Sequence, residues 1–129
     1  MVGKVGIDQT TPGITNAVAV SGIKGTVISV RNQSVTAGGF LTVGSFLLSE
    51  GVRRVGGTVR SADTFSMQLY IAYFGEDNAT LGNIGGGNTT VSVKNVGLSD
   101  MLSGKASIIF GNSDISPHTI SVDAVGVPN

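Results

Sequence analysis

The sequence contains no cysteine and no tryptophan, and it has a single histidine and three prolines in 129 residues. Without cysteine the chain can form no disulfide, and it offers neither a thiolate metal ligand nor a cysteine nucleophile. One histidine cannot supply the several imidazole ligands that histidine-based zinc centres use. We therefore expect no metal site, no other cofactor and no catalytic site.

Charge is scarce as well. Charged residues make up 12% of the chain, and the formal net charge is zero. Binding to the phosphates of nucleic acids needs a surplus of basic residues, so we expect no nucleic acid partner. The longest apolar stretch, residues 40–48, is interrupted by polar residues and is far shorter than the roughly 20 residues that span a bilayer. The first eight residues lack the apolar run of a signal peptide, so we expect neither a membrane partner nor export.

Glycine, by contrast, is abundant, with 20 residues. Glycine, asparagine and aspartate separate short runs of valine, isoleucine, threonine and serine, a pattern that is typical of antiparallel strands. No segment shows the periodicity of a helix. The predicted fold class is therefore all-β, an antiparallel β-sandwich of the jelly-roll or Ig-like type. The predicted strands are residues 4–7, 16–21, 26–31, 40–48, 52–60, 66–74, 89–96, 105–110 and 118–125.

The predicted strand 66–74 has bulky residues at both its odd and its even positions. One face carries Met67, Leu69, Ile71 and Tyr73, and the other carries Gln68, Tyr70, Ala72 and Phe74. The last strand is different, because Ile120, Val122 and Ala124 alternate with Ser121 and Asp123. We interpret the last strand as half-buried, and strand 66–74 as one whose outer face a neighbouring subunit covers.

Residues 1–25 form the first predicted unit, and residues 26–129 form the sandwich. The first unit has isolated apolar residues, among them Ile7, Ile14, Val18 and Val20, and these cannot by themselves bury enough surface to fold. Two interpretations remain open. The segment is either an edge strand of the sandwich or an extended arm that pairs with a neighbouring subunit by strand addition. We take the four apolar residues as candidate interface residues.

Arg53 and Arg54 are the other candidate interface residues, because guanidinium groups bind carboxylates of a partner protein. The sequence up to residue 60 carries a net charge of +4 and the remainder −4. Such halves can attract each other between subunits or pair within one folded chain, and the second interpretation is the simpler.

The other motifs favour structural roles. Gly85, Gly86 and Gly87 lack the Lys-Ser/Thr that a phosphate-binding loop needs, so we expect a hairpin tip. Gly56-Gly57 indicates a bulge or bend within a strand. The 76–78 acidic turn, even with Asp114, lacks the spacing of a calcium loop and is interpreted as solvated.

His118 is the one candidate general base that titrates near neutrality. A small hydrolase would need a nucleophile beside it, and the sequence has no Gly-x-Ser-x-Gly motif. We expect this histidine to lie at the surface or in a turn, hydrogen-bonded to the backbone.

The stretch from Val5 to Val20, VGIDQTTPGITNAVAV, resembles a recurring segment of tailed-bacteriophage structural proteins, with Ile14 at a position where threonine is more usual. The sequences at 52–61 and 104–113 are similar in pattern to small phage appendage and decoration proteins. The resemblance implies a non-enzymatic virion protein, assembled in the host bacterial cytoplasm, that forms a homo-oligomer and docks on other capsid or tail proteins. The alternative is a β-sandwich module that binds a receptor or a glycan.

Overall fold

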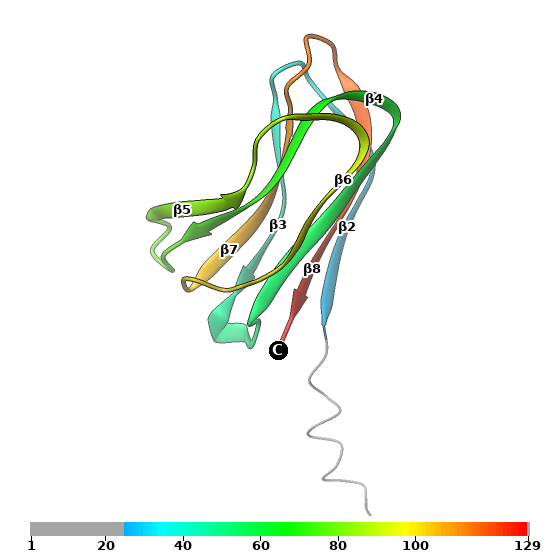
Figure 1. The fold of residues 1–129 in the computed structure, drawn as a ribbon. Coiled ribbons are helices and arrows are strands. Elements are labelled where there is room, and N and C mark those ends of the chain that lie inside the picture. The colour runs from blue at the N-terminus through cyan, green and yellow to red at the C-terminus, as the bar shows by residue number, and fades with distance from the viewer. Residues whose placement is uncertain (1–24, 129) are drawn as a thin grey trace, which may run out of the picture.

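The structure, a computed structural model, describes residues 25–128. Seven strands lie within this range, and every strand pair is antiparallel, which confirms the predicted all-β fold. The elements are β2 (Thr26–Val35), β3 (Phe40–Leu47), the short 3-10 helix η1 (Leu48–Glu50), β4 (Arg54–Phe74), β5 (Thr80–Gly85), β6 (Thr89–Asp100), β7 (Lys105–Asn112) and β8 (His118–Val127) (Figure 1).

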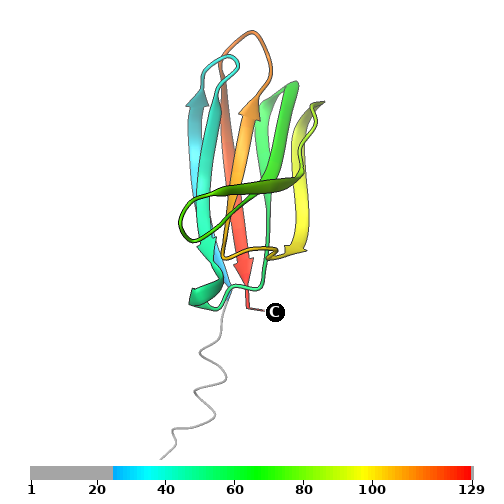
Figure 2. The same ribbon diagram turned by 90° about the vertical axis from the view of Figure 1, so that its left-hand side faces the viewer.

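The seven strands form one continuous sheet, and the long strand β4 links its two layers, which are called here the first and the second sheet. Its first part pairs with β8 on one side and β6 on the other, and its second part pairs with β7 and β5. Strand β2 extends the first sheet beyond β8, and β3 extends the second beyond β7. The first sheet therefore has the order β2-β8-β4-β6 and the second β3-β7-β4-β5. The two sheets form the layers of the predicted sandwich, shown from a second side in Figure 2.

Two details of the predicted strands are wrong. Residues 52–60 and 66–74 were expected as separate strands, but β4 runs from Arg54 to Phe74 and passes through residues 61–65 without a break. Here the strand bends and exchanges its partner β8 for β7, and its register with β6 shifts between Arg60 and Phe65. In addition, β5 was not among the strands expected from the sequence.

The predicted hairpin at Gly85-Gly86-Gly87 is also wrong. All three glycines have positive φ angles, but they connect β5 to β6, and each of these strands pairs with β4. The three glycines thus carry the chain from the second sheet to the first.

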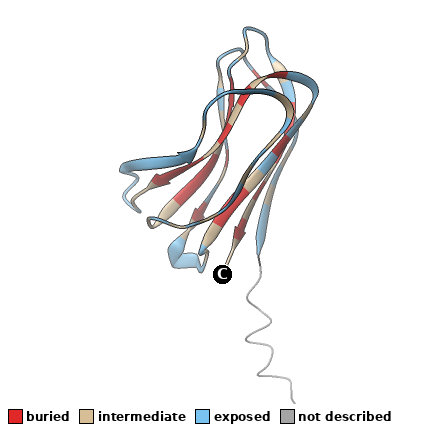
Figure 3. Ribbon diagram, in the orientation of Figure 1, coloured by how far each residue is buried: buried red, intermediate tan, exposed pale blue. Residues whose placement is uncertain are grey.

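The core lies between the sheets and matches the predicted inward residues. In β4, alternate side chains from Phe65 to Tyr73 are at most 3% exposed (Figure 3). On the other face, Gln68, Tyr70 and Phe74 are partly exposed, whereas Ala72 is buried. The rings of Phe65 and Phe110 meet edge to face with their centroids 6.3 Å apart. The core side chains come from residues 35–124, so the described residues form a sandwich with a core of their own. Strands β7 and β8 contribute the buried residues Ala106, Ile108, Phe110, Ile120, Val122 and Ala124.

Gly56 and Gly57 lie where β4 is in close contact with both of its neighbours in the first sheet. A Cβ atom on Gly56 would lie 2.9 Å from the carbonyl oxygen of Val96 in β6, and one on Gly57 would lie 2.9 Å from the carbonyl oxygen of Asp123 in β8. The register with β6 shifts between Val55 and Gly57, where two steps along β4 lie opposite three steps along β6, from Ser99 to Val96. The bulge therefore lies in β6, beside the two glycines, and not in the strand that carries them.

Candidate interaction surfaces

Within residues 25–128, no group of three or more histidine, aspartate or glutamate side chains could hold a metal ion. In the same range, no helix has the length and hydrophobicity needed to cross a membrane. The candidate sites are therefore surfaces that could contact another protein, together with the surroundings of the single histidine.

Arg53 and Arg54 lie at the end of the sandwich where β8 finishes. The backbone of Arg53 joins two elements, since its N–H donates to the carbonyl oxygen of Val127 at 2.7 Å and its carbonyl accepts from the N–H of Met101 at 2.8 Å. Its guanidinium donates to the carbonyl oxygen of Leu48 at 3.1 Å and so holds η1 in place. Arg53 thus has a structural role in addition to the interface role predicted for it.

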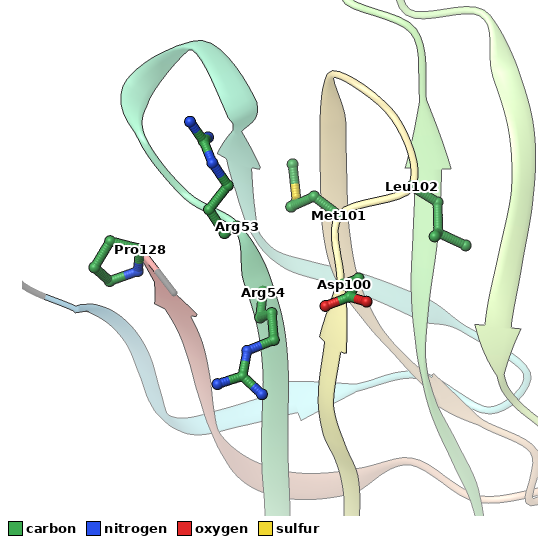
Figure 4. A pocket seen from close by; sticks show the side chains of 6 residues that line it. All are labelled: Arg53, Arg54, Asp100, Met101, Leu102 and Pro128. Atoms are coloured by element: carbon green, nitrogen blue, oxygen red, sulfur yellow. The ribbon is translucent and has the colours of Figure 1, made fainter.

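Arg54 is the first residue of β4 and lies in register between Val127 of β8 and Asp100 of β6. Both arginines line an open depression with Leu102, which is 66% exposed (Figure 4). The remaining lining residues are Asp100, Met101 and Pro128.

The first 24 residues join the sandwich at this same end. A Cβ atom on Gly25 would lie 3.4 Å from both the carbonyl oxygen of Gly126 and Cγ1 of Val127, so β2 begins beside the end of β8. The remaining candidate interface residues, Ile7, Ile14, Val18 and Val20, lie outside the described residues. Their role as an arm or as edge strands stays a prediction.

His118 lies at the opposite end, between two carboxylates. Its Nδ1 is 3.1 Å from Oδ2 of Asp63, at the bend of β4, and its Nε2 is 2.7 Å from Oδ2 of Asp114, in the loop before β8. The imidazole stacks on the ring of Phe65, with centroids 3.8 Å apart and planes 9° apart. The expected hydrogen bond to the backbone is therefore wrong, because both ring nitrogens face aspartates.

This arrangement favours the charged imidazolium, which donates from both nitrogens. The hydrogen bond to Asp114 is the main cause that raises the pKa of His118, and the same bond lowers the pKa of Asp114. While both ring nitrogens carry protons, the imidazole has no free lone pair with which to act as a base. The site therefore supports a structural clamp rather than the hydrolase considered from the sequence.

The opposite charges of the two sequence halves meet within the chain on the outer face of the first sheet. Asp123 of β8 accepts from Arg31 at 2.7 Å and lies 3.7 Å from Arg60. Its carboxylate also accepts from the hydroxyl of Ser29 at 2.6 Å, and this bond, with that from Arg31, lowers its pKa. The intramolecular interpretation of the charge pattern is thus confirmed for these residues.

One surface was not expected from the sequence, the free edge of β6. This strand pairs only with β4 among the described strands, and it exposes Val93 and Leu98 by 54% and 48%. Its only charged side chain before Asp100 is Lys94, whose amine turns back to the carbonyl oxygen of Gly87 at 3.1 Å. The strand itself was predicted, but its place at an edge depends on the pairing of distant segments.

No protein-family model and no curated protein matches the sequence. Among solved structures, the PBSX exported protein XepA is similar in fold, with a TM-score of 0.65 and 9% sequence identity over 81% of this chain. The chain spans only 37% of the XepA chain. PirA has a TM-score of 0.53 and 9% identity, and the match covers 78% of this chain and 93% of PirA. Similarity at these identities is a similarity of fold.

Proposed function

We propose that this chain is a non-enzymatic structural subunit of a bacteriophage virion, and that it assembles through its N-terminal segment and through the surface around Arg53 and Arg54. The main support for this proposal is that the folded sandwich and the N-terminal segment are separate parts of the sequence. Residues 25–128 form a sandwich with a core of their own, and residues 1–24 contain further apolar residues. A segment of this kind is suited to pairing with a second subunit.

The phage setting rests on the resemblance of residues 5–20 to a segment of tailed-phage structural proteins. The fold is compatible with it, since a β-sandwich can present edges and loops to neighbours in a repeated assembly. Partners would be identical subunits and other capsid or tail proteins, and the protein would be located in the virion after assembly in the host cytoplasm.

The end of the sandwich at which residue 25 begins supports a shared contact region. Gly25, Arg53, Arg54 and the exposed Leu102 all lie at this end. A partner seated in the depression would therefore meet two guanidinium groups and an apolar side chain close to Gly25, where the described residues begin. Arginine beside apolar surface is a common combination in protein interfaces.

A peptide of residues 1–24 tests the assembly function. We expect a fluorescent form of the peptide to bind the chain that starts at Gly25, with a rise in anisotropy, and an excess of unlabelled peptide to dissociate the full-length oligomer. The matched control is the same peptide with Val18→Lys and Val20→Lys, which should not bind. If the native peptide does not bind and the full chain has the mass of a single subunit, the assembly function is wrong, and the receptor-binding or glycan-binding alternative takes its place.

A further inference from the structure

We infer that the sandwich assembles head to tail, with the loop between β7 and β8 of one copy seated in the depression beside Arg53 and Arg54 of the next copy. This inference names the partner of that depression, and it rests on the proposed function. The loop comprises residues 113–117, and its central residue, Ile115, is 94% exposed. A single exposed isoleucine is common on protein surfaces and is not by itself a binding site. The rigidity of the loop, its charge and its place in the fold supply the argument.

Hydrogen bonds hold this loop in one conformation. The N–H of Ser113 donates to the carbonyl oxygen of Ser66 at 3.0 Å. The buried side chain of Asn112 binds the N–H of Asp114 and the carbonyl oxygen of Ser116, each at 2.9 Å. An apolar side chain at the tip of such a loop is already positioned before it meets a partner, so little conformational entropy is lost on binding.

The end of the sandwich that carries the loop has a net negative cluster. Asp63 and Asp114 are the two aspartates that contact His118, and their side chains are 61% and 34% exposed. One imidazolium cannot neutralise two carboxylates, so negative charge remains beside the exposed isoleucine. A partner surface for this loop should therefore combine apolar side chains with positive charge.

The depression at the other end has the complementary charge. It is lined by the guanidinium groups of Arg53 and Arg54 and by one carboxylate, that of Asp100. Among residues 25–128, the guanidinium of Arg53 contacts carbonyl oxygens rather than a carboxylate, since it donates to Leu48 and Val52 at 3.1 and 3.4 Å. The lining thus keeps a net positive charge.

The depression also offers apolar surface for the isoleucine. Three of its six lining residues, Met101, Leu102 and Pro128, have apolar side chains, and Leu102 is 66% exposed. Contact between Ile115 and these side chains would remove apolar surface from water on both copies.

The two surfaces lie at opposite ends of the same strand. Strand β8 begins at His118, beside the loop, and finishes at Val127, whose carbonyl oxygen accepts from the N–H of Arg53. Figure 1 shows the loop at the top of the sandwich and the end of β8 at the bottom. The ten residues of β8 separate the two surfaces by about 30 Å, at about 3.3 Å per residue. One copy therefore cannot place its own loop in its own depression, and a second copy is the occupant.

A contact between two different surfaces leaves each copy with one loop and one depression for further neighbours. Such a contact closes into a ring when the rotation between neighbours divides a full turn, and otherwise continues as a filament. The defined homo-oligomer of the proposed function corresponds to the ring. Gly25 lies at the same end as the depression, so contacts made by residues 1–24 would add to this interface.

A charge placed on either surface tests the contact in the full chain. Ile115→Lys brings a positive charge toward the two arginines, and Leu102→Asp brings a negative charge toward the aspartates of the loop. We expect each variant to raise the concentration at which half of the oligomer dissociates by about tenfold or more, because an apolar anchor is lost and like charges meet. The matched control is Val93→Asp, because Val93 is 54% exposed in the middle of β6. This control should keep the oligomer, and thermal unfolding checks that all three variants are folded.

A mixture of the two variants distinguishes head-to-tail contact from the other arrangements. The intact loop of Leu102→Asp can enter the intact depression of Ile115→Lys, so we expect the mixture to associate at concentrations at which each variant alone is dissociated. Association that is lost in Ile115→Lys but unchanged in Leu102→Asp, with no recovery in the mixture, would mean that two loops meet and would overturn the inference.

Cysteine pairs test the same contact without adding charge, since the chain has no cysteine of its own. Full-length Ile115→Cys mixed with full-length Leu102→Cys should give a disulfide-linked heterodimer under mild oxidation, whereas Ile115→Cys mixed with Val93→Cys should not. Equal cross-linking to both positions would contradict the assignment.

Removal of residues 1–24 separates failure of the inference from failure of the proposed function. If this deletion dissociates the oligomer while Ile115→Lys and Leu102→Asp leave it unchanged, the head-to-tail contact is wrong and the proposed function stands. If the full chain has the mass of one subunit before any substitution, the proposed function itself fails, and the inference fails with it.

Discussion

Nε2 of His118 lies 2.7 Å from Oδ2 of Asp114, four residues earlier, while Nδ1 of the same ring faces Asp63, 55 residues away in sequence. The histidine therefore connects the bend of β4 to the loop between β7 and β8. Because Phe65 stacks on the imidazole and is itself part of the core, this connection joins the loop to the packed interior of the sandwich.

The first prediction concerns the pH dependence of stability. The pKa of His118 is raised in the folded state, so its contribution to the free energy of unfolding is fully present below the unfolded value of about 6.5. We expect the free energy of unfolding to fall as the pH rises from about 6 through the folded-state pKa of His118. Urea denaturation at a series of pH values measures this change in the free energy of unfolding. His118→Gln should remove this decline, and a profile that is unchanged in this variant would contradict the clamp.

At acidic pH, the free energy of unfolding changes with pH in the opposite direction. The pKa values of Asp114 and Asp123 are lowered in the folded state, so the stabilisation that they provide is present above an unfolded pKa of about 3.9. It is lost as the pH falls through the lower folded-state values. The same denaturation series should therefore show a second decline below about pH 4. Asp123→Asn should reduce this acid decline and leave the decline near neutral pH in place.

Asn112 is predicted to be the most important polar side chain for stability. It is 1% exposed, and its amide nitrogen donates to the carbonyl oxygens of Val35, Thr36 and Ser116 at 2.9 to 3.2 Å. Its side-chain oxygen accepts from the N–H of Asp114 at 2.9 Å. We expect Asn112→Ala to lower the free energy of unfolding by about 3 kcal/mol, because several buried groups lose their partners.

The matched control for this substitution is Asn95→Ala, since Asn95 is exposed on β6. Surface substitutions of this kind change stability by about 0.5 kcal/mol or less. Chemical denaturation of the two variants gives the comparison, and equal effects would contradict the importance assigned to the buried amide.

A pair of glycines tests the close contact between β4 and β6. A Cβ atom at Gly56 would lie 2.9 Å from the carbonyl oxygen of Val96, whereas one at Gly97 would meet no atom within 4 Å. We expect Gly56→Ala to cost about 1 to 3 kcal/mol, because backbone must move to make room. Gly97→Ala should be close to neutral. Thermal unfolding ranks the two variants, and a larger loss at Gly97 would show that the contact is wrongly assigned.

The sequence predicts the parts of this fold that depend on local alternation. The inward residues of the last strand and of residues 66–74 could be identified because buried and exposed positions alternate along a strand. Strand β5 could not, because its Thr-Leu-Gly-Asn-Ile-Gly sequence is rich in residues typical of turns. The continuity of β4 through Ala62-Asp63 depends on the exchange of one partner strand for another, which a local pattern does not contain.

For the candidate sites, too, the sequence predicts local features but not contacts between distant segments. Arg53 and Arg54 could be singled out because arginines side by side are visible in the sequence, but the bond from Arg53 to Leu48 requires η1 to fold back beside it. The aspartate partners of His118 come from two different segments, and one of them is 55 residues away. The edge position of β6 likewise follows only from the order of strands in the first sheet.

The mass of the full chain in solution tests the proposed assembly role most directly. Light scattering coupled to size exclusion should give a defined multiple of the 13.0 kDa subunit for residues 1–129, and the mass of a single subunit for the chain that starts at Gly25. Single-subunit masses for both chains, maintained as the concentration is raised, would contradict the account.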